Sequence, residues 1–360
     1  MKAITVLLSA SGSQFAPGII KCLKKNGERN IKVIGVDMAD DPSNKYFVDE
    51  FYRVPSTASP DYVDEILKIC KKEHVEILLP QMSAELPLYW KNIERFTEIG
   101  TTVSMTSNQN IEIANNKLRL FEFMKEHDIP TPDFVGIHSL EEFDDALFSL
   151  GYPHKPVVVK IPDGSGARGV RVIDENKSKY ELFVHEKPSS MYISRDDMKE
   201  ILKDSENYLG KGNFPELMLM EYLPGDEYDI DLLASSGKVL YTAGRRNPDM
   251  VMSISQTSVL ERNERAERIS ECIVSALDLD GNLGFDFKFD SNGEAQLLEI
   301  NPRIDATVSI FAAGGLNLPY LRVKQLLGEP LPKVEVKYGT HLKRRYMETF
   351  TDADGNFIDW

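Results

Sequence analysis

The chain has 360 residues, of which 42% are apolar and 28% are charged, as in a globular protein of two or three domains. Its net charge of −15 argues against nucleic acid or an anionic membrane as a partner, because both attract basic surfaces. The cysteines, Cys22, Cys70 and Cys272, fit neither a zinc spacing nor a disulfide framework and indicate a reducing cytoplasm. No apolar run is long enough to span a bilayer, and Met1–Ala10 is better interpreted as a strand than as a signal peptide.

Strands and helices alternate up to about Thr106. The apolar pattern predicts these elements in order: a strand at Ile4–Leu8, a helix at Ile19–Lys25, a strand at Lys32–Val36, a helix at Tyr62–Lys72 and a strand at Glu76–Leu79. This alternation of strands and helices is typical of an open parallel sheet, which binds ligands at the carboxyl ends of its strands.

A dinucleotide site in this first part is disfavoured. Gly12 and Gly18 follow the first strand, and Asp37 follows the second, but the glycines do not form G-x-G-x-x-G. An NAD-dependent oxidoreductase is therefore the less favoured interpretation, and the turns at Ser9–Gly18 and Met82–Glu85 are expected to line a substrate site. Glu85 itself is either such a lining residue or an acid favoured by a helix dipole.

A helical connector follows, from Ser107 to Gly151. Helical periodicity covers Asn116–His127 and ends before Pro130. Ser139 and Glu142 have the spacing of a capping box at the start of a second helix.

A glycine-rich loop joins two expected strands, Pro156–Lys160 and Val170–Ile173. Its glycines, Gly164, Gly166 and Gly169, match G-x-G-x-x-G as text, but a dinucleotide fingerprint runs from strand to helix. Strand-to-strand loops of this kind cover ATP phosphates in some kinases. Lys160, at the end of the first strand, could reach α- and β-phosphates. The alternatives are a flexible surface hairpin and a solvated lysine.

Further along, the apolar strand Leu217–Glu221 exits into Tyr222–Gly225. This short segment could offer backbone groups to adenine, and Glu227 could accept from ribose hydroxyls. An ordinary turn at Pro224-Gly225 and solvated acids remain the alternatives. Another expected strand ends at Arg245-Arg246. These paired arginines could bind a carboxylate or a phosphate, or they could form a solvated strand end.

The most informative segment is Gly284–Arg303, which has the pattern of a β-hairpin around Asn292-Gly293. If these two residues form a two-residue loop, Asp286 lies opposite Glu299. Glu299 and Asn301 then share a strand face with Asp286, and such hard oxygen ligands suit Mg²⁺. Arg303 lies two residues after Asn301, which is the spacing of one strand face, and its side chain could bind a phosphate or carboxylate. The alternative is a solvated charged face.

The order of these features over nearly the whole chain resembles the ATP-grasp superfamily, and within it the short stand-alone relatives of the carbamoyl-phosphate synthase large chain. The resemblance implies that Lys117 and Lys160 hold phosphates and that the loop with Gly164, Ser165, Gly166 and Gly169 closes over them. It further implies adenine contacts at Glu221, Tyr222 and Leu223, a ribose contact at Glu227, metal ligands at Asp286, Glu299 and Asn301, and catalytic roles for Arg303 and Lys160. Asn116 stands where many relatives have Asp, which puts the orientation of Lys117 in doubt.

The implied fold is α/β, in part α+β. It has a pre-ATP-grasp domain with an open parallel sheet at residues 1–106, a connector belonging to the ATP-grasp unit at 107–151, a small subdomain with the glycine-rich loop at 152–225, and a C-terminal subdomain with the metal site at 226–360.

The implied activity is that of a carboxylate–amine, or carboxylate–thiol, ligase. Such an enzyme uses ATP and Mg²⁺, with Mn²⁺ as a substitute, and forms an acyl-phosphate on a small metabolite. The expected partners are small carboxylates and amines, and homodimers are common among relatives. A nucleotide-binding module without turnover remains the alternative.

Overall fold

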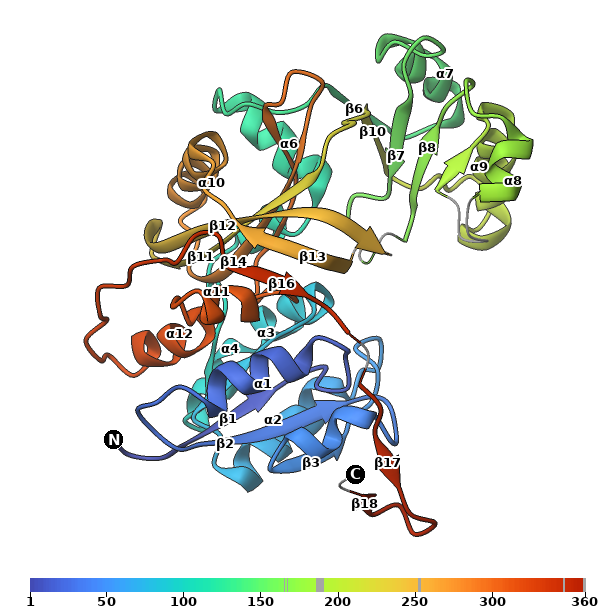
Figure 1. The fold of residues 1–360 in the computed structure, drawn as a ribbon. Coiled ribbons are helices and arrows are strands. Elements are labelled where there is room, and N and C mark those ends of the chain that lie inside the picture. The colour runs from blue at the N-terminus through green and yellow to red at the C-terminus, as the bar shows by residue number, and fades with distance from the viewer. Residues whose placement is uncertain (165, 167, 186–190, 252–253, 346, 359–360) are drawn as a thin grey trace. The chain divides into compact units, whose positions relative to one another are not determined.

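The computed structural model describes residues 1–164, 166, 168–185, 191–251, 254–345 and 347–358 (Figure 1). The chain divides into two compact units. The first comprises Met1–Glu112, Glu227–Asp286 and Ile300–Trp360, and the second comprises Ile113–Asp226 and Phe287–Glu299. Among the described residues, no helix has the length and apolar character needed to cross a membrane.

The first unit opens with the predicted parallel sheet, whose strand order is β3-β2-β1-β4-β5. All four pairings in it are parallel. The strands are β1 (Ile4–Leu8), β2 (Ile31–Asp37), β3 (Glu50–Arg53), β4 (Ile77–Leu79) and β5 (Thr102–Val103). The expected α/β architecture is confirmed, because the apolar β1 is buried at the centre between two strands that each arrive by a crossover.

Helices cover both faces of this sheet. Successive side chains of a strand point to opposite faces, so Val6 and Leu8 belong to one core and Leu7 to another. The first core adds α1 (Ala16–Lys24), α11 (Ser309–Ala313) and α12 (Leu318–Leu326). The second adds α2 (Tyr62–Glu73), α3 (Leu86–Lys91) and α4 (Ile93–Glu98). Shorter helices are η1 (Ser43–Phe47), η2 (Ser83–Glu85) and α5 (Ile111–Ala114).

A second sheet has the order β15-β14-β11-β12-β13-β16. Its strands are β11 (Glu227–Ser235), β12 (Lys238–Val251), β13 (Ile254–Leu260), β14 (Gly281–Phe289), β15 (Ala295–Asn301) and β16 (His341–Lys343). The helix α10 (Glu264–Ala276) begins at Asn263, whose side chain accepts a hydrogen bond from the N–H of Ala266. Leu233, Ala243 and Leu260 of this sheet share a core with β1 and α1, which joins the two sheets of the first unit. A short hairpin of β17 (Phe350–Thr351) and β18 (Phe357–Ile358) follows.

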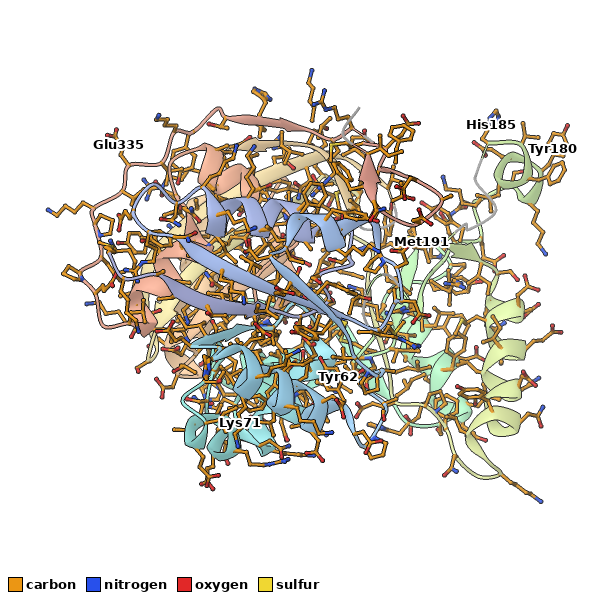
Figure 2. All side chains as sticks on the ribbon, turned by 90° about the horizontal axis from the view of Figure 1, so that it is seen from below. Tyr62, Lys71, Tyr180, His185, Met191 and Glu335 are labelled. Carbon is orange, nitrogen blue, oxygen red and sulfur yellow. The ribbon has the colours of Figure 1, made fainter. Side chains whose placement is uncertain are left out.

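The second unit is built on a sheet with the order β6-β10-β7-β8-β9. Its elements are α6 (Lys117–Glu126), β6 (Phe134–Ile137), α7 (Leu140–Ser149), β7 (Val157–Lys160), β8 (Val170–Ile173), α8 (Lys179–His185), β9 (Tyr192–Ile193), α9 (Arg195–Leu209) and β10 (Leu217–Glu221). Phe143 and Leu147 of α7 and Leu202 of α9 form its core with the sheet. Tyr180 and His185 of α8 point outward (Figure 2).

The predicted capping box at Ser139 is wrong. Ser139 stands at the N-cap of α7, but its side chain makes no capping hydrogen bond. Glu142 instead accepts from the N–H of His138, at 2.8 Å, so the donor is the residue before Ser139 and not Ser139 itself.

We expect Gly244→Ala to destabilise the first unit. Gly244 lies in β12, and a Cβ there would overlap the hydroxyl of Tyr228, which is buried and donates to the carbonyl of Glu261 at 2.9 Å. Overpacking of this kind costs about 1–3 kcal/mol. Urea unfolding measures the loss, and Gly284→Ala is the control because its Cβ meets its nearest neighbour at an ordinary 3.4 Å. Equal stability of the two variants would contradict the expectation.

Candidate active site

The ammonium group of Lys117 joins three parts of the second unit. Lys117 is the first residue of α6, and Asn116 caps that helix by accepting from the N–H of Arg119 at 3.0 Å. The Nζ atom donates to the carbonyl oxygen of Gly164 at 2.7 Å and lies 2.7 Å from Oε2 of Glu299. The predicted phosphate lysine, glycine loop and metal-ligating acid therefore meet at one cation, although Glu299 lies far from the other two in sequence.

The glycine-rich loop connects two antiparallel strands, as expected. Lys160 of β7 lies opposite Val170 of β8, and the N–H of Ile161 donates to Gly169 at 3.1 Å. Gly169 has a φ of +72°, and a Cβ on Gly164 would lie 2.8 Å from a backbone oxygen, so both positions require glycine. Gly166 also has a positive φ, of +64°. Ser165 lies outside the described residues.

Lys160 is buried rather than solvated. Only 7% of it is exposed, and it sits between β8 and β10, opposite Val170 and Met218. A solvated strand end is therefore the wrong interpretation. A buried ammonium group is costly unless it is compensated by polar or anionic groups.

The segment after β10 is anchored at both ends. Glu221 exchanges two bonds with Asp133, because its N–H donates to the Asp133 carbonyl at 3.0 Å and its Oε1 accepts from the Asp133 N–H at 3.1 Å. Leu223 is buried, and the N–H of Gly225 donates to Phe289 at 2.9 Å. The ring of Tyr222 lies below the ammonium of Lys288, at 5.7 Å. Glu227, the first residue of β11, lies opposite Asn247 and belongs to the first unit.

In the first unit, Asn301 connects two of the other predicted residues. Its Nδ2 donates to Oδ2 of Asp286 at 3.0 Å, and its Oδ1 accepts from Nη2 of Arg303 at 2.8 Å. Arg303 is further held by a bond from Nη1 to the carbonyl of Ile304, at 2.9 Å. Asp286, Asn301 and Arg303 thus form one connected polar group.

The hairpin loop differs from the prediction. Asp290 pairs with Glu294 through a 3.0 Å backbone bond, and the N–H of Gly293 donates to the Asp290 carbonyl at 3.1 Å. The loop therefore has three residues, because the Asp290 carboxylate accepts from the N–H groups of Asn292 and Glu294 and favours the longer turn. Farther from the loop, Gly284 lies near Asn301, since a Cβ built on Gly284 would be 3.7 Å from the Cβ of Asn301. The pairing of Asp286 with Glu299 stays a prediction.

The residue types at Asp286, Glu299 and Asn301 fit Mg²⁺. The described residues contain no cluster of three or more His, Cys, Asp or Glu side chains suited to a metal. Mg²⁺ does not require one, because it is usually held by one or two carboxylates and completes its shell with water and phosphate oxygens. Two carboxylates and an amide oxygen are a donor set of this kind.

A buried cluster in the first unit surrounds Arg245, which is 3% exposed. Its Nη2 lies 2.5 Å from Asp229 and 3.0 Å from Asp305, its Nε lies 3.8 Å from Asp231, and its Nη1 donates to Asn247 at 2.7 Å. A solvated strand end is therefore wrong for Arg245. The three acids were not predicted from the sequence; the available signal is two buried acids, Asp229 and Asp231, inside the largely buried β11.

Three carboxylates share this single guanidinium, so they cannot all ionise easily. Burial raises the pKa of Asp231 well above its ordinary value and that of Asp229 to about 7, although Arg245 opposes both shifts. The pKa of Asp305 is lowered despite its burial, because Arg245 and Arg303 attract its charge and the N–H of Thr307 donates to it. Asp305 therefore carries the permanent negative charge of the cluster.

Glu85 and Asp37 have structural partners in the amino-terminal sheet. Glu85 is fully buried and accepts from Ser9 at 2.6 Å, from the hydroxyl of Tyr62 (Figure 2) and from the N–H of Met82 at 3.2 Å. Burial raises the pKa of this carboxyl. Glu85 is therefore neither an exposed lining residue nor simply a dipole acid. Asp37 accepts from the N–H groups of Gly12 and Ala39, each at 2.9 Å, so both of its carboxylate oxygens are hydrogen-bonded to the backbone.

Comparison with known families matches two parts of the chain. Residues 213–350 match a family described as "ATP-grasp in the biosynthetic pathway with Ter operon", and residues 6–104 match the PylC-like N-terminal domain. The carbamoyl phosphate synthase large chain of Clostridium acetobutylicum is 22% identical over 293 residues. That alignment covers 79% of this chain and 25% of the relative, so the chain spans about a quarter of the relative's length.

Solved structures agree on the fold. A biotin carboxylase from Campylobacter jejuni superposes with a TM-score of 0.69 at 15% identity, covering 92% of this chain and 73% of that one. The biotin carboxylase domain of the Hydrogenobacter thermophilus 2-oxoglutarate carboxylase, in complex with MgADP and bicarbonate, has a TM-score of 0.66 at 18% identity, covering 94% and 73%. The chain therefore contains an ATP-grasp domain and a PylC-like N-terminal domain. The expected resemblance and α/β fold class are confirmed, and the chain is homologous to the carbamoyl phosphate synthase large chain.

Asp229 should make the stability of the protein depend on pH. The native carboxyl keeps its proton up to about pH 7, whereas an unfolded aspartate loses it near pH 4, so the folded state binds the extra proton between these values. The free energy of unfolding should then fall as pH rises, by up to about 1.4 kcal/mol per pH unit from this group.

Asp229→Asn should flatten this slope in urea unfolding at pH 5, 6 and 7. Asp249→Asn is the matched control, because Asp249 lies on the neighbouring strand β12 and is exposed. Parallel slopes for the wild type and Asp229→Asn would contradict the assignment.

Proposed function

We propose that this protein is an ATP- and Mg²⁺-dependent ligase that joins a small carboxylate to an amine through an acyl-phosphate; a thiol acceptor is the variant of the same chemistry. The observation that carries the proposal is the ammonium of Lys117, which lies 2.7 Å from both the Gly164 carbonyl and the Glu299 carboxylate. A cation placed between a glycine-rich loop and an acidic strand end is suited to a polyphosphate with its metal. The match of residues 213–350 to an ATP-grasp family and the homology to a carbamoyl phosphate synthase chain support it.

We assign the parts of the nucleotide to separate groups of residues. Lys117, Lys160 and the loop glycines of the second unit neutralise and enclose the phosphates, while backbone groups from Glu221 to Leu223 contact adenine. Glu227 of the first unit accepts from the ribose. Asp286, Glu299 and Asn301 would hold Mg²⁺, which when bound neutralises phosphate charge during transfer.

The chemistry requires no side-chain nucleophile. A carboxylate oxygen of the substrate attacks the γ-phosphorus of ATP, the bond to the β-phosphate oxygen breaks, and ADP leaves. The amine nitrogen then attacks the acyl carbon, inorganic phosphate leaves with the bonding electrons, and the nitrogen loses a proton. Lys160 and Arg303 stabilise the charge that develops on the transferring group.

The glycine-rich loop is the proposed lid. Gly166 and Gly169 adopt positive φ values that other residues rarely reach, so the loop can open and close without side-chain strain. Closure would exclude the water that hydrolyses an acyl-phosphate.

The cellular setting proposed is the cytoplasm. Cys22, Cys70 and Cys272 are free thiols, the first two of them buried, which fits a reducing compartment. The partners proposed are small acids and amines, and a homodimer is consistent with the relatives' behaviour.

ADP release with Mg-ATP, measured across a matrix of acids and amines, tests the proposal. We expect ADP to form only when a particular acid and amine are both present. ADP with an acid alone would indicate acyl-phosphate formation with the wrong amine. Tight ATP binding with no ADP under any pair would favour the nucleotide-binding module instead.

Glu299→Ala should lower the rate of Mg-dependent ADP formation at least about a hundredfold, because one of two carboxylate ligands is lost, while the protein stays folded. Glu294→Ala is the control, since this acid lies at the exposed end of the same hairpin. ADP formation that is unchanged in Glu299→Ala would contradict the metal assignment, and circular dichroism checks the fold.

A further inference from the structure

A half-buried arginine just beyond β16, Arg344, has no carboxylate as a direct partner among the residues that the structure describes. Its Nε donates to the carbonyl of Ser255 at 2.7 Å, and its Nη2 donates to the hydroxyl of Thr307 at 3.0 Å. The guanidinium lies 5.5 Å from the centre of the Phe15 ring. All three partners are neutral, so the positive charge of Arg344 is not balanced by them.

Other arginines buried in the first unit are paired differently. Arg29 pairs with Glu329, Arg322 lies 2.6 Å from Asp280, and Arg245 contacts its own acids. Buried charges in proteins are normally paired in this way, because desolvation is costly. Arg344 departs from that pattern and marks a place where an added anion would be stabilised.

The electrostatic surroundings strengthen this conclusion. The pKa of Arg344 is lowered, first by burial and then by repulsion from Arg245, and Asp305 offsets this only in part. Asp305 is already bonded to Arg245 at 3.0 Å. A second negative charge beside Arg344 would therefore meet little competition from the protein.

The contacts also select the shape of the anion. Phe15 lies beside the guanidinium, Nε and Nη2 each donate one hydrogen bond, and Nη1 has no hydrogen-bond partner among the described residues, so the Nη1 end of the fork is available to an anion. The edge of an arginine fork fits a planar carboxylate with two parallel hydrogen bonds. Phe15 also lies between β1 and α1, at the carboxyl end of the parallel sheet, where ligands of such sheets bind.

We propose that Arg344, with Phe15 and Thr307, binds a substrate carboxylate other than the one that ATP phosphorylates. Arg303 is the arginine assigned to the transferring phosphoryl group, and both arginines interact with Asp305, so two anionic groups have separate cations. The substrate class is then a small metabolite with a second carboxylate, supplied either by a dicarboxylic acid or by an amino acid that acts as the amine. The inference rests on the proposed ligase function.

Binding of matched probes without nucleotide tests the inference. Succinate is compared with monomethyl succinate, and L-alanine with L-alaninamide, by isothermal titration and ligand-observed NMR on the full chain. At least one free acid should bind more tightly than its masked analogue. Arg344→Gln should weaken that binding by about ten- to a hundredfold, because two charge-assisted hydrogen bonds are lost. The affinity of Arg344→Lys for the acid should lie between those of the wild type and Arg344→Gln, because lysine keeps the positive charge but lacks the planar guanidinium.

Arg345→Gln is the matched control, since it removes the same charge from the exposed neighbouring residue. Phe15→Leu gives a second test that leaves the guanidinium bonds in place, and it should weaken binding several-fold. The thermal midpoint of each variant shows whether the fold is kept.

Equal affinities for Arg344→Gln and Arg345→Gln would overturn the inference, as would equal binding of the free and masked probes or no binding of either acid to the wild type. These results are distinct from a failure of the proposed function. Acid binding that depends on Arg344 without any ADP formation would contradict the ligase activity alone. ADP formation with acid affinity unchanged in Arg344→Gln would contradict only this site.

Discussion

The guanidinium of Arg245 holds together the segments of the first unit on which the proposed chemistry depends. It joins β11 through Asp229, β12 through Asn247, and the segment after β15 through Asp305. Arg303 lies two residues before Asp305 and Asn301 lies four residues before it, so this ion pair anchors the end of the segment that carries them. Removing one partner of such a buried pair typically costs about 3–5 kcal/mol, because the other charge is left uncompensated. The cluster is thus a structural requirement placed next to the residues assigned to the metal.

The second unit has a comparable centre in Lys117. A helix start capped by Asn116 presents the ammonium to a loop carbonyl and to the end of β15. Because the loop glycines lie between β7 and β8, the same small sheet positions Lys160 and the loop. Lys117 and Arg245 therefore each hold a group of neighbouring residues together through contacts inside one unit.

The residues assigned to anionic groups are positively charged, although the protein as a whole is acidic. The protein carries a net charge of −15, yet the groups assigned to phosphate and carboxylate are local cations. Most buried arginines are neutralised by acids, whereas Arg303 and Arg344 bond directly to neutral oxygens. Cations that lack a directly bonded carboxylate favour anionic substrates at these positions, even in an acidic protein.

The sequence by itself determined the elements and the identity of most candidate residues. Apolar periodicity marks β1, β2 and β4, and the order of the candidate residues from Lys117 through the glycine loop to Arg303 suggested the superfamily. Only the tertiary structure decided which of them meet. The cluster of Asp229, Asp231 and Asp305 around Arg245, the three-residue loop closed by Asp290, and the stacking of Arg344 on Phe15 all join residues through space or through side-chain hydrogen bonds. Local patterns report which face of a strand or helix is buried, but they carry no information on which distant side chain completes a charge or a hydrogen bond, because that depends on packing between elements.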